Sequence, residues 1–156
     1  MEALLEFLAL IKRELVVIGT AAIPVVELRG AIPVGMAMGL SMWHSFILAL
    51  IGSLIPVPLL LYFLRPVVNY LKETKLLRWF AVWLENRTMK KSKQIKNLSL
   101  IGLCLFVAIP FPSTGVWTGS AIAALLGMRI SHALCAIAVG DLIAGLMVMT
   151  FSNFFF

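Results

Sequence analysis

The longest apolar runs of the chain predict two membrane-spanning helices. Residues 43–64 and 130–151 are almost entirely apolar, and each run reaches the roughly 20 residues that a helix needs to cross a bilayer. Pro56 and Pro58 lie within the first run, and membrane helices tolerate proline when neighbouring groups satisfy the backbone. We therefore predict one span in each half of the chain.

Four shorter apolar segments come in two pairs, and polar or helix-breaking residues separate the members of each pair. The segments are residues 15–26 and 31–40 in the first pair, and residues 98–109 and 116–128 in the second. Each segment is too short to cross the membrane. We therefore predict two re-entrant helical hairpins with broken tips at 27–30 (Glu-Leu-Arg-Gly) and 110–115 (Pro-Phe-Pro-Ser-Thr-Gly).

Two further segments have an amphipathic pattern. Residues 1–14 mix leucines with charged residues, and residues 69–84 combine apolar positions with Lys72, Lys75 and Arg78. Both are expected to lie as helices in the membrane interface, and residues 85–97 are expected to form a polar hinge. The first segment lacks the basic residues that precede the apolar core of a cleaved signal peptide, so none is expected.

The two halves repeat the same order of elements: an amphipathic helix, a broken pair of arms and a span. The matching residues are Ala22-Ile23-Pro24 with Ala108-Ile109-Pro110 at an offset of 86, and Gly39, His44 and Gly52 with Gly127, His132 and Gly140 at an offset of 88. The change of offset falls at the broken tips, where insertions are tolerated.

The predicted fold is therefore all-α, with one membrane domain over residues 1–156. It comprises repeat one (1–64), a linker (65–97) and repeat two (98–156). A re-entrant hairpin adds no net crossing, so each half crosses once and the halves are inverted, as in many secondary transporters. The pattern leaves open an alternative of four or more ordinary spans kinked at prolines.

Composition and charge support a membrane protein. The chain is 62% hydrophobic and 13% charged, against about 45–50% and about 25% in soluble domains. These values exclude a soluble enzyme, a nucleic-acid module and a multidomain protein. Residues 65–96 hold nine basic and two acidic side chains, and this local excess places the 65–97 linker in the cytoplasm. Cys104 and Cys135 lie in apolar runs and are expected to pack rather than bind metal.

Glu27 and Arg29 are the most informative polar residues. Each charge at bilayer depth costs at least about 2.5–3.5 kcal/mol, so such residues are functional candidates. Gly30 and Pro33 flank them, which suits an unwound turn followed by a new helix. On such a tip both charges can face one cavity and form an anion or proton site. A purely structural ion pair is the alternative.

The second tip offers hydrogen-bond donors. Its candidate binding residues are Pro110, Pro112, Ser113, Thr114, Gly115, Trp117, Thr118 and Gly119. The prolines end the first arm, and Ser113 or Thr114 can cap the second. The free N–H groups of a helix N-terminus bind phosphate or carboxylate well. Close helix packing by small residues is the alternative.

Asp141 is the remaining deep acidic residue and a possible proton carrier, near the repeat equivalent of Ser53. A partner such as Arg129 or a hydroxyl group would instead make it structural. His44 and His132 are expected to be interfacial polar residues rather than metal ligands. The sequence holds no Ser-His-Asp set, phosphate-binding loop or zinc motif. We therefore expect neither an enzyme nor an organic cofactor.

At Glu27-Leu-Arg-Gly-Ala-Ile-Pro33 and Pro110-Phe-Pro-Ser-Thr-Gly-Val-Trp-Thr-Gly119, the chain resembles the small multidrug export proteins of the DedA-like superfamily of membrane transporters. The resemblance covers nearly the whole chain and implies two opposed re-entrant hairpins that meet near the midplane. It also implies a prokaryotic cytoplasmic (inner) membrane. Superfamily members are linked to flipping of lipid-linked phosphates such as undecaprenyl phosphate, driven by H⁺ or Na⁺. DedA-type second hairpins carry arginines around the proline, whereas this chain has Ile109, Ser113 and Thr114 there.

Three hypotheses follow. The first is an ion-coupled flippase or transporter of an anionic lipid-linked substrate, and the second is a small multidrug or cation exporter driven by proton exchange. The third is a structural membrane protein without transport activity. Arg29 favours the first over the second, because a cation site gains nothing from an adjacent fixed positive charge. The partners expected are membrane lipids and, because the chain is small, a second copy in a homodimer, but not nucleic acid.

Overall fold

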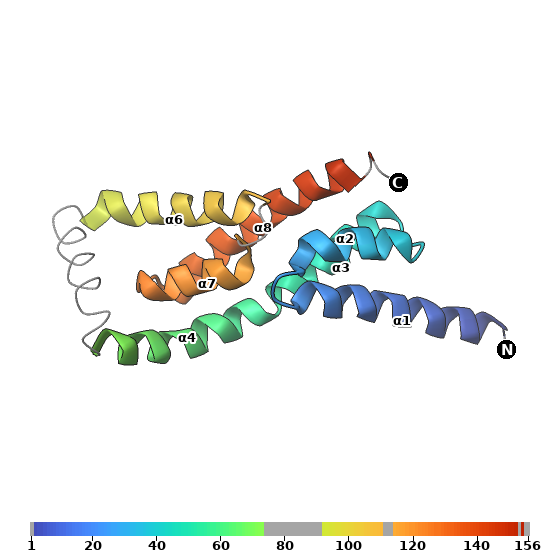
Figure 1. Ribbon diagram of the computed structural model, residues 1–156, viewed down its shortest axis with the longest axis horizontal. Coiled ribbons are helices and arrows are strands. Elements are labelled where there is room, and N and C mark those ends of the chain that lie inside the picture. Colours follow the sequence, from blue (N-terminus) through green and yellow to red (C-terminus); the bar gives the residue numbers. More distant parts are fainter. Residues whose placement is uncertain (1, 74–91, 111–113, 153, 155–156) are drawn as a thin grey trace.

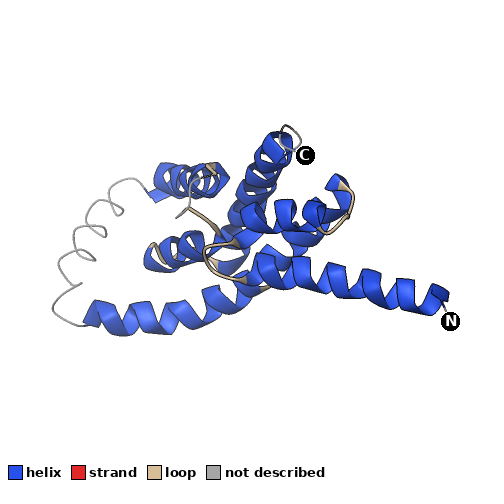
Figure 2. Cartoon of the chain, turned by 45° about the vertical axis from the view of Figure 1, so that its right-hand side comes forward, coloured by secondary structure: helices blue, strands red, loops and turns tan. Residues whose placement is uncertain are grey.

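The described residues of the computed structural model are 2–73, 92–110, 114–152 and 154, and their regular structure is entirely helical (Figures 1 and 2). The helices are α1 (Glu2–Ala22), α2 (Glu27–Ala37), α3 (Met42–Leu54), α4 (Pro56–Glu73), α6 (Ser92–Ala108), α7 (Val116–Leu125) and α8 (Ile130–Ser152). This agrees with the all-α prediction.

Two helical stretches have the length and composition of membrane spans. Met42–Val67, which includes α3 and most of α4, contains an 18-residue window with a mean hydropathy of 2.4, and the corresponding window of Ile130–Ser152 has a mean hydropathy of 2.1. Most residues of both stretches lie on the surface of the molecule, whereas the apolar core helix of a soluble protein is mostly buried. These two candidate spans coincide with the two predicted ones, with a change of helix at Ile55 in the first.

The path of the chain brings both hairpin tips to the middle of the molecule (Figure 1). α1 runs from the end that holds both termini to the middle, and α2 turns back toward that end. α6 runs inward from the opposite end, and α7 turns back toward it. The two helix pairs α1–α2 and α6–α7 therefore approach the middle of the molecule from opposite ends.

Each half of the molecule has its own apolar core. The first core contains Val17, Leu28, Ile32 and Phe46 from α1, α2 and α3, and it also includes Met149 near the end of α8. The second core combines α6, α7 and the first part of α8 with α4. Each span therefore begins in the core of its own half and ends in the core of the other.

Several predicted boundaries are wrong. α1 is one continuous helix where an interfacial helix (1–14) and an arm (15–26) were expected, and α6 already begins at Ser92, within the predicted hinge. The first tip is 23–26 rather than 27–30. Pro24 explains this shift, because the residue before a proline disfavours the helical conformation. The rest of the predicted interfacial helix and hinge, at 74–91, lies outside the described residues.

Equivalent glycines make equivalent helix contacts in the two halves. An added Cβ at Gly52 would lie 2.5 Å from the Ile18 carbonyl oxygen, and one at Gly140 would lie 2.5 Å from the Cys104 carbonyl oxygen. The contacting pairs are related by the offsets of 86 before the tip and 88 after it. The same helix contact thus occurs once in each half of the chain.

The ends of α2 and α7 also match. Gly39 and Gly127 both have positive φ angles, of 84° and 63°. Leu40 N–H donates to the Gly35 carbonyl over 3.1 Å, and Met128 N–H donates to the Ala123 carbonyl over 3.0 Å. Both helices therefore end in the glycine turn that satisfies the last helical carbonyls.

The Gly140 contact gives a stability prediction. Gly140→Ala is expected to lower the free energy of unfolding by about 1–3 kcal/mol, because the methyl group overlaps α6 backbone. The control is Gly102→Ala on exposed α6 surface, where a Cβ meets no atom within 4 Å and helix propensity favours alanine. Unfolding by SDS in mixed micelles measures both variants. Equal effects would contradict the assigned contact.

Candidate functional site

Arg29 connects the first hairpin to the end of α6. Its Nη2 donates to the carbonyl oxygens of Val107 (3.2 Å), Ile109 (3.0 Å) and Thr114 (2.6 Å). The carbonyls at a helix C-terminus lack partners within the helix and carry a partial negative charge. Arg29 therefore binds the C-terminal end of α6, the first helix of the second hairpin.

Glu27 binds the N-terminal end of α7, the second helix of the second hairpin. Its Oε1 accepts the backbone N–H of Trp117 over 3.4 Å, and the backbone N–H of Val116 is a further donor to the carboxylate. An added Cβ at Gly115 would lie 1.5 Å from Glu27 Oε2, and only 6% of Glu27 is exposed. The helix N-terminus that was expected to hold a substrate anion thus holds the carboxylate of Glu27.

The two charges match the two helix ends that they contact. A helix N-terminus carries a partial positive charge and a C-terminus a partial negative charge. The first hairpin presents a carboxylate to the former and a guanidinium to the latter. The pair therefore connects the two tips and is more than a local ion pair within α2.

Burial also affects the protonation of Glu27, which lies outside both candidate spans. Loss of hydration raises the pKa of its carboxyl group, whereas the N–H of Trp117, the charge of Arg29 and the N–H of Val116 lower it. The net direction is upward. Proton uptake by Glu27 therefore occurs closer to neutral pH than for an exposed glutamate.

The first tip has an unusual backbone. Val25 and Glu27 adopt positive φ angles of 84° and 50°, and this region is unfavourable for residues other than glycine. Glu27, Arg29 and Gly30 form the first turn of α2, with Pro33 inside the helix, so their prediction as an unwound tip is wrong. An added Cβ at Gly30 would lie 2.4 Å from Val26 Cγ1, which shows that Gly30 packs against the tip.

The cap of α7 also differs from the expectation. The residue before α7 is Gly115, whose N–H donates to Thr118 Oγ1 over 3.0 Å. Thr114 Oγ1 donates to the Ile109 carbonyl over 2.7 Å, and the N-cap position belongs to Gly115. Pro112 and Ser113 lie outside the described residues, and α6 ends at Ala108, before Pro110.

Two further second-tip residues are in packing positions. An added Cβ at Gly119 would lie 2.7 Å from Val107 Cγ2, so Gly119 allows α6 and α7 to approach each other. The indole Nε1 of Trp117 is buried and has no hydrogen-bond partner within the described part of the chain. Of the second-tip candidates, Gly115 and the backbone N–H of Trp117 contact Glu27.

Asp141 lies near this contact. It is 3% exposed on α8, its Oδ2 lies within hydrogen-bonding distance of the Ser53 hydroxyl on α3, and it interacts electrostatically with Glu27 and Arg29. A hydroxyl group was one of the two partners predicted for Asp141 from the sequence, and Ser53 provides it. Ser53 was not predicted as a site residue, although its offset of 88 from Asp141 was a usable signal.

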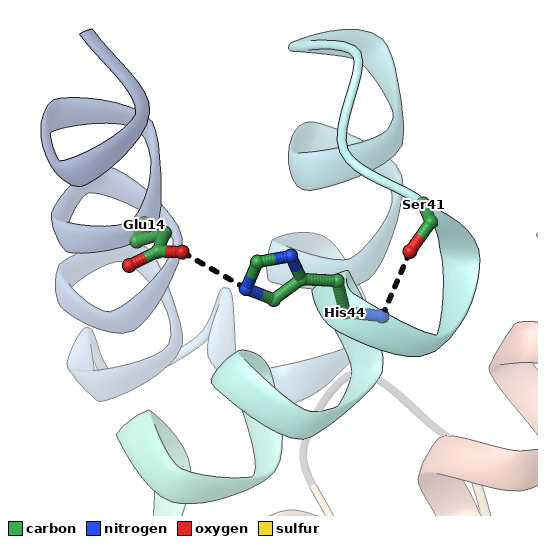
Figure 3. Close-up of polar contacts among 3 residues, drawn as sticks. All are labelled: Glu14, Ser41 and His44. Carbon is green, nitrogen blue, oxygen red and sulfur yellow. Dashed lines mark hydrogen bonds and ion pairs between the residues drawn. The ribbon is translucent and has the colours of Figure 1, made fainter. Parts of the chain in front are cut away.

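His44 has an ordinary structural partner. Its Nε2 lies 3.0 Å from Glu14 Oε1 on α1, and its backbone N–H donates to Ser41 Oγ at the start of α3 (Figure 3). Among the described residues, no group of three or more His, Cys, Asp or Glu side chains is suited to hold a metal ion. His44 thus joins α1 to the first span.

The two long apolar helical stretches are typical of an integral membrane protein. The chain belongs to the family described as "Putative small multi-drug export protein", whose pattern matches residues 27–147. The match begins at Glu27, the first residue of α2, and includes the second tip and most of α8. No curated protein and no solved structure matches the chain.

Proposed function

We propose that this protein is a proton-coupled membrane transporter, and not an enzyme, whose substrate carries a phosphate or carboxylate group. One observation carries the proposal: the N-terminus of α7 already binds a buried carboxylate, that of Glu27. Backbone N–H groups that accommodate this internal anion suit the head group of an anionic substrate equally well.

Protonation of Glu27 is the coupling step. The ionised carboxylate accepts N–H groups of α7 strongly, and the neutral acid accepts them weakly. A substrate anion then replaces Glu27 at α7, while Arg29 stays charged because a guanidinium does not lose its proton in proteins. Loss of the proton restores the Glu27 contact and expels the substrate. One proton thus accompanies one negative charge through the site.

The proposed substrate is a lipid-linked phosphate such as undecaprenyl phosphate. A polar site in the middle of an apolar molecule suits a ligand whose head group crosses the membrane while its tail stays in lipid. The proposal includes opposed re-entrant hairpins, an inverted repeat and DedA-like kinship in the inner membrane, with the 65–97 linker cytoplasmic. It also includes a homodimer, and Na⁺ is an alternative coupling ion.

A second candidate is export of cationic drugs in exchange for protons, as the family name suggests. The described site contains two buried acidic residues, Glu27 and Asp141, and one basic residue, Arg29. When both acids are ionised, this group carries a net negative charge that a cation would balance. Substrate charge therefore distinguishes the two candidates.

The test is transport in proteoliposomes at a series of pH values. We expect flipping of a fluorescent lipid phosphate to slow as pH rises, by up to about tenfold per unit where Glu27 is mainly ionised. Glu27→Gln, which mimics the neutral acid, is expected to keep transport and lose this pH dependence. The matched control, Glu14→Gln, removes an acid on α1 and should retain the wild-type profile.

Two results would reject the anionic-substrate proposal. One is a wild-type pH profile in Glu27→Gln. The other is proton-driven efflux of a cationic dye, without lipid phosphate transport, that is lost in Glu27→Gln; this result would establish the second candidate.

A further inference from the structure

We propose that Asp141 and Ser53 form a second proton-binding site, in which the bound proton determines which way the Ser53 hydroxyl group points. The site joins the two membrane spans, because Ser53 lies on α3 and Asp141 on α8. Its use in coupling rests on the proposed transport function, but proton binding itself is measurable without any substrate.

Burial is the first argument. Ser53 is fully buried and Asp141 is 3% exposed, and Ser53 is the hydrogen-bond partner that the described residues give to Asp141. An ionised carboxylate in such a place loses its hydration and gains one neutral donor in return. Its energetic cost is high, and a buried acid in this situation binds a proton instead.

The count of hydrogens is the second argument. Ser53 Oγ lies 3.0 Å from the Leu50 carbonyl oxygen and also within hydrogen-bonding distance of Asp141 Oδ2. A hydroxyl group has one hydrogen to donate, and a carbonyl has none. Both contacts are full hydrogen bonds only when Asp141 is protonated and donates to Ser53, while Ser53 donates to Leu50.

The surrounding charges leave this arrangement intact. From α2, Glu27 disfavours the ionised form of Asp141 and Arg29 favours it, so their effects oppose each other. α7 has no titratable residue, and the nearby α6 group is the Cys104 thiol. On α4, Arg65 donates to the Met128 carbonyl before α8 begins. On α3, His44 is nine residues from Ser53, about 13 Å along the helix.

The position of the pair in the repeat supports a central role. Ser53 and Asp141 are 88 residues apart, the offset that relates Gly52 to Gly140. Each is therefore the repeat equivalent of the other, and equivalent positions touch only on the axis that relates the two halves. In an inverted repeat that axis lies in the plane of the membrane, near its centre.

A change in the Ser53 hydrogen bond acts beside a break in the first span. α3 ends at Leu54 and α4 begins at Pro56. When Asp141 loses its proton, the hydroxyl of Ser53 turns to the carboxylate and its bond to the Leu50 carbonyl is lost. Side-chain bonds of serine to the preceding turn change the local bend of a helix. The proton on Asp141 thus adjusts the angle between α3 and α4.

Infrared difference spectroscopy of the purified protein in lipid tests the site directly. We expect a carboxylic-acid C=O band near neutral pH that is absent in Asp141→Asn and shifted in Ser53→Ala, because the latter loses the hydrogen bond. The control Glu14→Gln should leave the band unchanged, and Glu27→Gln separates any band from Glu27. Asp141→Asn spectra identical to wild type at every pH would overturn the proposal, as would an unshifted band in Ser53→Ala.

The outcome is independent of the proposed substrate. If the Asp141 band is present while lipid phosphate is not transported, the proton site stands and the anion proposal fails. If Glu27→Gln abolishes the pH dependence of transport while no band belongs to Asp141, the transport proposal stands and the Asp141 proton site fails.

Discussion

Arg29→Ala is expected to abolish transport of the anionic substrate at every pH. The guanidinium is the permanent positive charge at the tip contact, and its Nη2 donates to carbonyls of Val107, Ile109 and Thr114. A hydrogen bond to a charged group contributes about 1.5–3 kcal/mol, so we also expect a loss of at least about 2–3 kcal/mol of stability. Flipping of lipid phosphate and SDS unfolding measure the two effects.

Two further variants separate loss of charge from loss of fold. Arg29→Lys keeps the positive charge but replaces the planar fork of donors by one ammonium group, so we expect reduced stability with transport partly retained. The control Arg13→Ala removes an exposed arginine of α1 and should change neither transport nor stability. Full transport by Arg29→Ala would show that the residue only joins the two tips.

The spans and the existence of two broken hairpins followed from the sequence, because run length and proline positions are local properties. The details of the first tip did not. Positive φ angles at Val25 and Glu27 oppose local preference, and Glu27 contacts a distant segment of the chain. Glu27 and Trp117 are 90 residues apart. No local pattern therefore indicates that Glu27 binds the N-terminus of α7, the helix that contains Trp117.

The sequence located the charged site residues but not their partners. Glu27, Arg29 and Asp141 stood out because charge within apolar sequence is costly. The N-terminus of α7, which was predicted to bind a phosphate, contacts the Glu27 carboxylate of the same chain. Ser53 was missed because a serine in an apolar helix is common, and only its contact with Asp141 makes it significant.

Gly115→Ala is expected to have the second large effect, because its methyl group would occupy the space of the Glu27 carboxylate. An added Cβ would lie 1.5 Å from Glu27 Oε2, and the Gly115 backbone, with φ −108° and ψ −165°, suits alanine. Any loss is therefore due to the side-chain overlap and not to backbone strain. We expect a destabilisation of about 1–3 kcal/mol and loss of pH-dependent transport.

A double-mutant cycle tests this assignment. Residues in contact show non-additive effects, whereas distant ones add within about 0.3–0.5 kcal/mol. Gly115→Ala should be strongly destabilising in the wild type and nearly neutral in a Glu27→Ala background, where the carboxylate is gone. Gly102→Ala, which meets no neighbouring atom, should have the same effect in both backgrounds. If Gly115→Ala is equally destabilising with and without Glu27, the carboxylate does not occupy the N-terminus of α7, and the anion site proposed there loses its main support.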